Sequence, residues 1–250
     1  MIKENQRTKQ SYEAMFSGVI GQEYEMLKLI CPLATEMSRL VGDAVKEYSG
    51  TKKTSLTVVE LGGGTGITTL SILLANQDVS VMSVDNEPTM QVQAKQSLND
   101  WVEEGRLNFS ADDALTALKA IKSNSVDLVA SAYTLHNFQH EYRKQVHQEI
   151  YRVLKKGGQF INGDRYALDD ISKHTYMIQQ EVANYFKVLT KLDKLDVLEH
   201  WIIHLFNDES ENHVMRESVA LNELKETGFS ALQLTNRMEV NAVLMAIKDK

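Results

Sequence analysis

The chain has 250 residues, 43% of them hydrophobic, and a formal net charge of −7. This length and composition suit one globular domain, and the acidic balance without a Lys/Arg cluster argues against nucleic-acid binding. One cysteine, Cys31, excludes an internal disulfide or a CxxC metal site. The first residues lack the apolar segment of a signal peptide, and no apolar run is long enough for a membrane span. We therefore expect a cytoplasmic protein that does not associate with membranes.

Helices are predicted first, over residues 11–48, because apolar positions recur there at spacings of three and four. After Gly50, apolar strands alternate with helices, which is typical of a parallel sheet covered on both faces. The predicted strands are 56–61, 79–84, 107–110, 126–132 and 159–162. The predicted helices between them are 66–76, 88–104, 114–121 and 141–154, the last of which we expect Gly157 and Gly158 to end.

The pattern changes after the fifth strand. Residues 170–206 form a long helical region rich in aromatic and histidine side chains, and a further helix ends at Gly228. The last two strands, 231–238 and 241–247, are too close for a crossover helix and must be antiparallel. We predict an α/β fold with a Rossmann-like, doubly wound sheet of seven strands, mostly parallel with an antiparallel C-terminal strand. Within this single domain we expect an N-terminal helical cap (1–50), a core (51–165 and 207–250) and a helical substrate cap (166–206).

Four glycines follow the first strand, in the segment VVELGGGTGITTL that begins at Val58. They lie at the switch point of the predicted sheet, where ligands bind beyond the strand ends. Glycine allows close backbone approach and positive φ, and the helix N-terminus offers free N–H groups. The dinucleotide pattern GxGxxG does not fit, because Ile67 stands where its third glycine belongs. The spacing that fits is GxGxG at Gly62, Gly64 and Gly66; the alternative is a turn with only structural meaning.

The second predicted strand ends at Asp85, about two dozen residues after Gly62. A carboxylate at this position can accept both ribose hydroxyls of a nucleoside. The alternative is that Asp85 caps the helix that begins near Pro88.

The GxGxG spacing resembles motif I of the class I S-adenosylmethionine (SAM) dependent methyltransferases, whose sheet also ends in an antiparallel strand. The segment HQEIYRVLKKGGQFINGD is similar to the family's RVLKPGG segment, with Lys156 in place of the proline. The resemblance covers Tyr12 to Lys248 and implies SAM as the cofactor. It implies that Asp85 binds the ribose and that Asp112, or its neighbour Asp113, contacts the adenine amino group. The cofactor-binding residues expected from it are Tyr12, Glu60, Gly62, Gly63, Gly64, Gly66, Asp85, Asn86, Asp112, Asp113 and Ala132.

The fourth strand ends in ASAYTLHNF, where the family's motif IV faces the transferred methyl group. SAYT is not the [DNS]PP[YF] motif of enzymes that methylate base amines, and no cysteine nucleophile lies here. The strand also lacks the several carboxylates of the catechol type, although Asp164 after the fifth strand is a candidate lone metal ligand. We therefore expect a small-molecule acceptor. His136 is the candidate proton acceptor, or a pocket wall or helix cap, and Tyr133 is the competing pocket residue.

Two other functions stay open. The early Tyr-x-x-x-Phe, the helical insertion and the C-terminal segment also resemble carboxy-SAM synthase, which converts SAM and needs an arginine for the added carboxylate; residues 185–205 contain none. A catalytically inactive SAM-binding regulator is the other alternative. His200 and His204 lie one helical turn apart, but without a third ligand nearby we expect no metal. The helical N-terminus and the insertion offer surfaces for a homodimer.

Overall fold

The computed structural model describes residues 31–51 and 55–249 of the chain. Tyr12 and most of the expected N-terminal cap lie outside the described residues.

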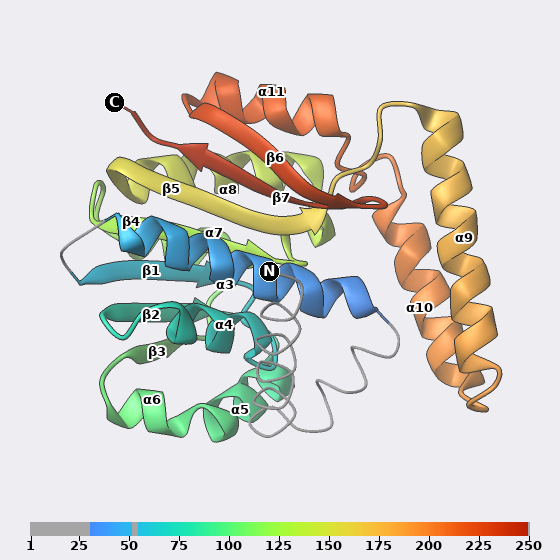
Figure 1. The fold of residues 1–250 in the computed structure, drawn as a ribbon, viewed down its shortest axis with the longest axis horizontal. Coiled ribbons are helices and arrows are strands. Elements are labelled where there is room, and N and C mark those ends of the chain that lie inside the picture. Colours follow the sequence, from blue (N-terminus) through green and yellow to red (C-terminus); the bar gives the residue numbers. More distant parts are fainter. Residues whose placement is uncertain (1–30, 52–54, 250) are drawn as a thin grey trace, which may run out of the picture.

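One sheet of seven strands organises the described part of the chain, in the order β3-β2-β1-β4-β5-β7-β6 (Figure 1). The strands are β1 (Leu56–Leu61), β2 (Val79–Val84), β3 (Leu107–Ser110), β4 (Val126–Ala132), β5 (Leu154–Arg165), β6 (Ser230–Met238) and β7 (Asn241–Ile247). Strands β1 to β5 pair in parallel, whereas β7 lies antiparallel between β5 and β6. This arrangement confirms the predicted Rossmann-like fold, and the strand order reverses between β1 and β4, where ligands bind in such sheets.

Helices cover both faces of the sheet (Figure 1). They are α3 (Pro32–Gly50), α4 (Ile67–Ala75), α5 (Pro88–Ser97), α6 (Asn99–Glu103), α7 (Ala114–Ala120), α8 (His140–Val153), α9 (Ile171–Leu189), α10 (Leu195–Asp208) and α11 (Glu217–Thr227), with a short 3-10 helix η1 (Leu135–Asn137). One hydrophobic cluster joins α3 and α4 to the sheet, and a second joins α7, α8 and α11 to its other face. Residues 32–50 of the expected N-terminal cap therefore pack directly on the sheet as α3.

Two predicted boundaries were wrong. Helix α8 ends at Val153 and β5 begins at Leu154, so Gly157 and Gly158 lie inside a strand and do not end the helix. Gly157 has a φ of +76°, and a Cβ on Gly158 would lie 2.9 Å from the Asp127 carbonyl oxygen. The glycines therefore accommodate the irregular start of β5, where its pairing with β4 shifts register. The predicted helix 88–104 divides at Leu98, whose side chain is fully buried.

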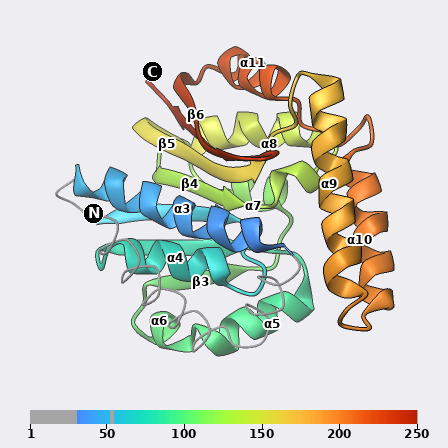
Figure 2. The ribbon, with the colours of Figure 1, turned by 45° about the vertical axis from the view of Figure 1, so that its right-hand side comes forward.

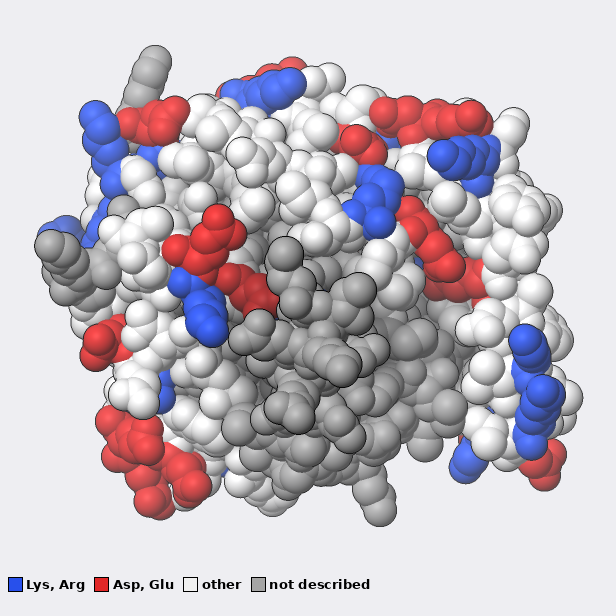
Figure 3. Space-filling view, in the orientation of Figure 1, with Lys and Arg blue, Asp and Glu red and all other residues white. Residues whose placement is uncertain are grey.

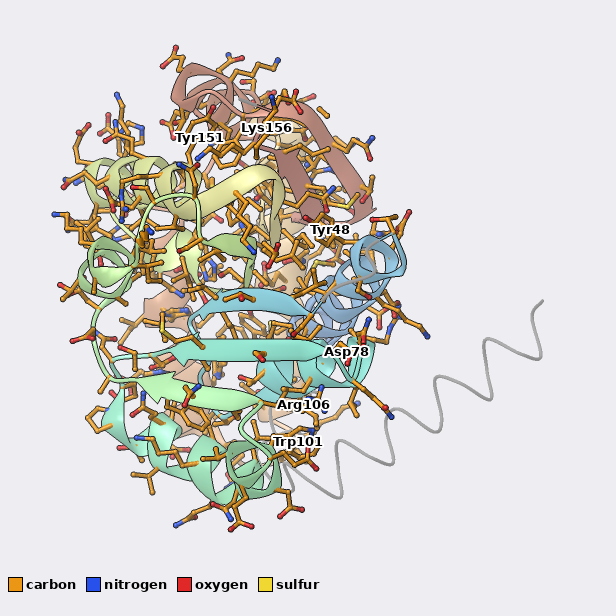
Figure 4. All side chains as sticks on the ribbon, turned by 90° about the vertical axis from the view of Figure 1, so that its left-hand side faces the viewer. Tyr48, Asp78, Trp101, Arg106, Tyr151 and Lys156 are labelled. Atoms are coloured by element: carbon orange, nitrogen blue, oxygen red, sulfur yellow. The ribbon has the colours of Figure 1, made fainter. Side chains whose placement is uncertain are left out.

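Figure 4 looks onto the amino ends of the parallel strands, where side chains have structural roles. The Arg106 guanidinium donates hydrogen bonds of 2.8 Å to the carbonyl oxygens of Leu73 and Asn76, at the end of α4. The Tyr48 hydroxyl donates to the carbonyl oxygen of Gly157 at 3.1 Å. These hydrogen bonds hold the connecting segments against the core. The candidate functional residues lie at the opposite end of the sheet, where the parallel strands end.

Helices α9 and α10 lie side by side beyond the carboxyl ends of the strands (Figures 1 and 2). They enclose a hydrophobic cluster of their own, built around Tyr185, Leu189, Leu198 and Leu205. The predicted helical insertion is therefore a helical hairpin that faces the sheet edge where the glycines lie.

Charged side chains of both signs are interspersed on the face shown in Figure 3, without a continuous basic area among the described residues there. None of the helices in residues 31–51 and 55–249 has the length and apolar character of a membrane span.

Candidate active site at the carboxyl edge of the sheet

The glycine loop turns from β1 into α4 through three residues of positive φ: Gly62 (+73°), Gly64 (+52°) and Gly66 (+96°). A Cβ on Gly62 would lie 1.9 Å from Thr134 Oγ1, so this position is closed by the protein itself. A Cβ on Gly64 would meet nothing nearer than Met90 Sδ, at 3.9 Å. The backbone at Gly64 therefore faces open space, where a ligand can approach it closely.

Glu60, at the end of β1, and Gly63, within the loop, form the side of the loop that faces the sheet. Glu60 is fully buried, and its Oε2 accepts a hydrogen bond of 2.6 Å from the Thr69 hydroxyl. Burial raises the pKa of the Glu60 carboxyl to about 7. A Cβ on Gly63 would lie 2.0 Å from Ser83 Oγ, so this glycine allows the loop to sit close on β2. The two residues thus support the loop from beneath.

A cleft of about 720 Å³ runs from the glycine loop along the ends of β2 and β3. It is lined by Asp85, Asn86, Asp112 and Asp113, the four residues that the sequence analysis expected near a bound nucleoside. Asp85 accepts hydrogen bonds from the backbone N–H of Gly64 at 2.7 Å and of Glu87 at 2.8 Å. Each carboxylate oxygen can accept more than one hydrogen bond, so Asp85 can hold the loop and still bind hydroxyls in the cleft.

The neighbouring carboxylates Asp112 and Asp113 have different tasks. Asp113 is the N-cap of α7 and accepts hydrogen bonds from the Thr116 hydroxyl at 2.6 Å and the Tyr142 hydroxyl at 2.7 Å. These bonds, that of Thr116 first, lower the pKa of Asp113 to about 2. Asp112 accepts from the Ser110 hydroxyl and is otherwise exposed to the cleft. Asp112 is therefore the better placed acceptor for a ligand.

A second cavity, of about 270 Å³, adjoins the cleft and shares Gly62, Gly64 and Tyr133 with it. Ala132, at the end of β4, also lines this cavity. Helices α9 and α10 close its far side with Tyr185, Trp201 and Leu205.

His136 lines this second cavity from η1 and is almost fully buried. Its Nδ1 lies 2.5 Å from Oδ1 of Asp164, the last but one residue of β5. Burial alone would raise the pKa of Asp164, but the charge and hydrogen bond of His136 outweigh this and the pKa is lowered. An ionised Asp164 favours a proton on Nδ1, so in the neutral imidazole the lone pair lies on Nε2. The sequence had offered Asp164 only as a lone metal ligand; its pairing with His136 was missed.

Tyr133 has a positive φ of +52°, a conformation that bulky side chains adopt rarely. Its hydroxyl donates to Asn241 Oδ1 at the start of β7, and burial raises its pKa well above the ordinary value. The ring lines the cavity while the hydroxyl is engaged elsewhere, so Tyr133 is placed as a wall of the cavity.

Several polar residues in and next to the hairpin were not predicted. Arg165 at the end of β5 forms a two-point ion pair with Glu181 of α9, at 2.9 and 3.1 Å, and contacts Glu209 at 3.3 Å. Asp208 lies one turn after His204 and is buried against His136. His200 lines the cleft from an exposed position and does not join this group. The only signal in the sequence was the spacing of four residues between His204 and Asp208, which places both on one face of a helix. The sequence does not show that this face lies against the end of β5.

These features fit SAM: acidic groups line the nucleoside cleft, open space faces Gly64, and a smaller cavity continues beyond it. A family model described as a methyltransferase domain matches residues 58–158. The chain is similar to the carboxy-S-adenosyl-L-methionine synthase of Shewanella oneidensis, with 26% identity over 62% of this chain and 61% of the relative. It is also similar to the demethylmenaquinone methyltransferase of Leptospira interrogans, with 32% identity over 51% of this chain and 48% of the relative.

The chain thus spans less than two thirds of each of these two curated relatives. Among solved structures, a putative SAM-dependent methyltransferase from Methanococcus maripaludis has the same fold, with a TM-score of 0.60 and 18% identity over 92% of this chain and 93% of that chain. A methyltransferase domain is thus recognised over residues 58–158, and the fold and the relatives support a class I SAM-dependent methyltransferase with SAM as its cofactor.

Proposed function

We propose that this protein transfers the methyl group of SAM to an O, N, S or C nucleophile of a small molecule held in the 270 Å³ cavity. The observation that carries the proposal is the arrangement of two adjoining cavities on either side of Gly64, one lined by carboxylates and one by His136. When bound, SAM supplies a methyl group already activated by its positively charged sulfur. The protein then has to align the acceptor and exclude water.

On the cofactor side, we assign Asp85 to the ribose hydroxyls and Asp112 to the adenine amino group. Both carboxylates line the cleft and retain acceptor capacity. The backbone of Gly64 would lie against the amino-acid part of SAM, because its missing side chain leaves that space open. Tyr12 stays a prediction for this side of the site.

On the acceptor side, we assign His136 as the group that receives the acceptor's proton through Nε2. Asp164 holds the imidazole by its Nδ1 proton and would stabilise the imidazolium that forms. The aromatic rings of Tyr133, Tyr185 and Trp201 line the cavity and favour an acceptor with an apolar or aromatic body. We keep the cytoplasmic location and the homodimer as parts of this proposal, the latter because Ile203 and Phe206 expose their side chains on α10.

Conversion of SAM to carboxy-SAM is the second candidate, because the relatives include a carboxy-SAM synthase. That reaction needs a cation to hold the added carboxylate. Arg165 lines the cavity, but Glu181 and Glu209 already bind its guanidinium. This neutralisation favours methyl transfer. An inactive SAM-binding regulator is disfavoured because the acceptor cavity is open.

The test is incubation of the full chain with SAM and a metabolite extract, followed by mass spectrometry. Methyl transfer yields S-adenosylhomocysteine together with a methylated product. Accumulation of carboxy-SAM would replace the proposal with the second candidate, and tight SAM binding without any product would favour the regulator.

The role of His136 is tested by His136→Ala. A lost proton acceptor should cut turnover about a hundredfold or more, since general bases contribute roughly 10²–10⁴-fold, with little change in SAM affinity. Turnover within a few-fold of wild type would reduce His136 to a wall of the pocket.

A further inference from the structure

Three potential metal ligands converge where α10 meets η1. His136 Nε2 lies 3.8 Å from Asp208 Oδ2, and His204 Nε2 lies 3.7 Å from the same oxygen. One ligand atom from each residue can be chosen so that all lie within 4.8 Å of one another. We propose that His136, His204 and Asp208 bind a divalent transition-metal ion of the Zn²⁺ type.

The separations are too long for hydrogen bonds but close to those around a metal. Zn–ligand bonds of about 2.0–2.1 Å in a tetrahedral site place neighbouring ligand atoms roughly 3.3 Å apart. The observed 3.7 and 3.8 Å to Asp208 Oδ2 are slightly longer than this, and the third separation, between the two histidines, lies within 4.8 Å. The His204 side chain is half-exposed, so its imidazole ring can rotate toward a bound ion.

An unsatisfied polar atom points independently to a missing ligand. Asp208 is nearly fully buried, yet its Oδ1 has no hydrogen-bond partner among the described residues. A buried carboxylate oxygen without a partner is costly, and such atoms in folded proteins are normally satisfied by protein, water or an ion. The two histidines face Oδ2, so a cation held by both carboxylate oxygens of Asp208 would also give Oδ1 the partner that the described residues do not supply.

His136 already has the second contact that metal-binding histidines show. Its Nδ1 is held by the buried Asp164 carboxylate at 2.5 Å, which leaves Nε2 as the metal-facing atom. Carboxylate–histidine pairs of this kind fix the ring and raise the basicity of the ligand.

Charge around the cluster also favours a cation. Four carboxylates lie around the Arg165 guanidinium, which pairs directly with Glu181 and Glu209, while His174 also contacts Glu209. The other two are Asp164 and Asp208. A divalent ion would offset the excess of negative charge in this largely buried region.

The ligand types indicate which ion. Two imidazoles and one carboxylate suit Zn²⁺ and Fe²⁺, whereas Mg²⁺ and Ca²⁺ prefer sites built from oxygen. All three residues line the 270 Å³ cavity, so the remaining coordination position faces the acceptor. An acceptor hydroxyl bound there would have a lowered pKa. Metal binding and proton acceptance use the same lone pair of His136, so His136 would act as a base only in the metal-free protein.

The experiment is a Zn²⁺ titration of the full chain by calorimetry, after treatment with EDTA and removal of the chelator. We expect one tight site per chain. His204→Ala and Asp208→Asn should each weaken it by more than the roughly 10- to 100-fold that is typical of lost outer-shell partners. His200→Ala is the matched control, because it removes an exposed histidine one turn away on α10, and it should leave the tight site intact.

Titration with Co²⁺ gives a second measurement, since visible absorption bands report nitrogen and oxygen ligands in a site of low coordination number. The bands should appear in wild type and His200→Ala and disappear in His204→Ala. The melting temperature of each variant without metal shows whether it is folded. His204 is half-exposed, so we expect His204→Ala to fold, and this variant alone tests the proposal if Asp208→Asn does not fold. Equal Zn²⁺ affinity in wild type and His204→Ala, or equal loss in His200→Ala, would overturn the proposal. The titration needs neither SAM nor an acceptor, so its outcome is independent of the proposed methyl transfer.

Discussion

The open space in front of Gly64 is the feature of the proposed cofactor site that a single substitution can probe most directly. Gly64→Ala adds one methyl group to a backbone with φ +52°, and the nearest protein atom to it is 3.9 Å away. The cost to folding is therefore only the left-handed conformation, about 1–2 kcal/mol, which lowers the melting temperature by roughly 2–8 °C for a domain of this size. SAM affinity should fall at least about tenfold, because a displaced contact of about 1.4 kcal/mol already has that effect.

Gly105→Ala is a matched control for this strain. Gly105 also has a positive φ (+72°) and open space around its Cβ position, but it lies in the exposed turn before β3, and it lines neither the cleft nor the second cavity. Both variants should lose similar stability in thermal unfolding, while calorimetry with SAM should show weakened binding only for Gly64→Ala. If Gly64→Ala bound SAM as tightly as Gly105→Ala does, the glycines would only form a turn and the placement of SAM against this loop would be wrong.

Three further predictions concern carboxylates and a buried histidine. Asp112→Ala should lower SAM affinity with little change in stability, whereas Asp113→Ala should lower stability by about 1 kcal/mol through the lost helix cap; calorimetry and urea unfolding of both variants separate the two roles. Burial, with Arg143 as a second cause, lowers the pKa of His147 from 6.5 to about 3, so the unfolded chain takes up a proton below pH 6.5 that the folded protein excludes. Wild type should lose about 3 kcal/mol more than His147→Leu between pH 7.5 and 4.5 in urea unfolding, and equal losses would contradict this. Burial raises the pKa of Glu60 from 4.5 to about 7, so the folded protein keeps a proton that the unfolded chain releases and stability falls as the pH rises through this window. Glu60→Gln should remove about 3 kcal/mol of that decline between pH 4.5 and 8, and an unchanged slope would show that Glu60 is not protonated in the fold.

The sheet could be predicted because its strands carry local signals. The strand bounds at 56–61, 79–84, 107–110, 126–132 and 241–247 coincide with those of the structure, since each is an apolar run that ends at turn residues. The start of β5 could not be predicted this way. Its glycines look like a helix stop, and only pairing with β4 shows that they allow an irregular strand.

That Gly64, Asp85 and Asp112 line one cleft could also be predicted from the sequence, because each follows a strand and strand ends meet at one edge. The group of side chains around His136 could not be predicted. The contact between His136 and Asp164 joins residues 28 positions apart on different elements, and Asp208 meets them only through the path of α10. No local pattern specifies these distances, which depend on how the hairpin docks.

The site lies between two structural units, the sheet with its covering helices and the α9–α10 hairpin, and each has its own hydrophobic core. The glycine loop, Asp85 and His136 belong to the sheet edge, which the large hydrophobic clusters on both faces hold in place. Trp201 and His204 belong to the hairpin, whose small core is its own. The buried ion pair of Arg165 with Glu181 ties the second unit to the first, and breaking such a pair leaves an uncompensated charge. The position of the hairpin, and with it the shape of the 270 Å³ cavity, therefore depends in part on this polar contact. Under the proposed function, substitutions at Tyr185 of α9 would change the acceptor cavity alone, whereas Trp201 and His204 of α10 line both this cavity and the cleft proposed for SAM.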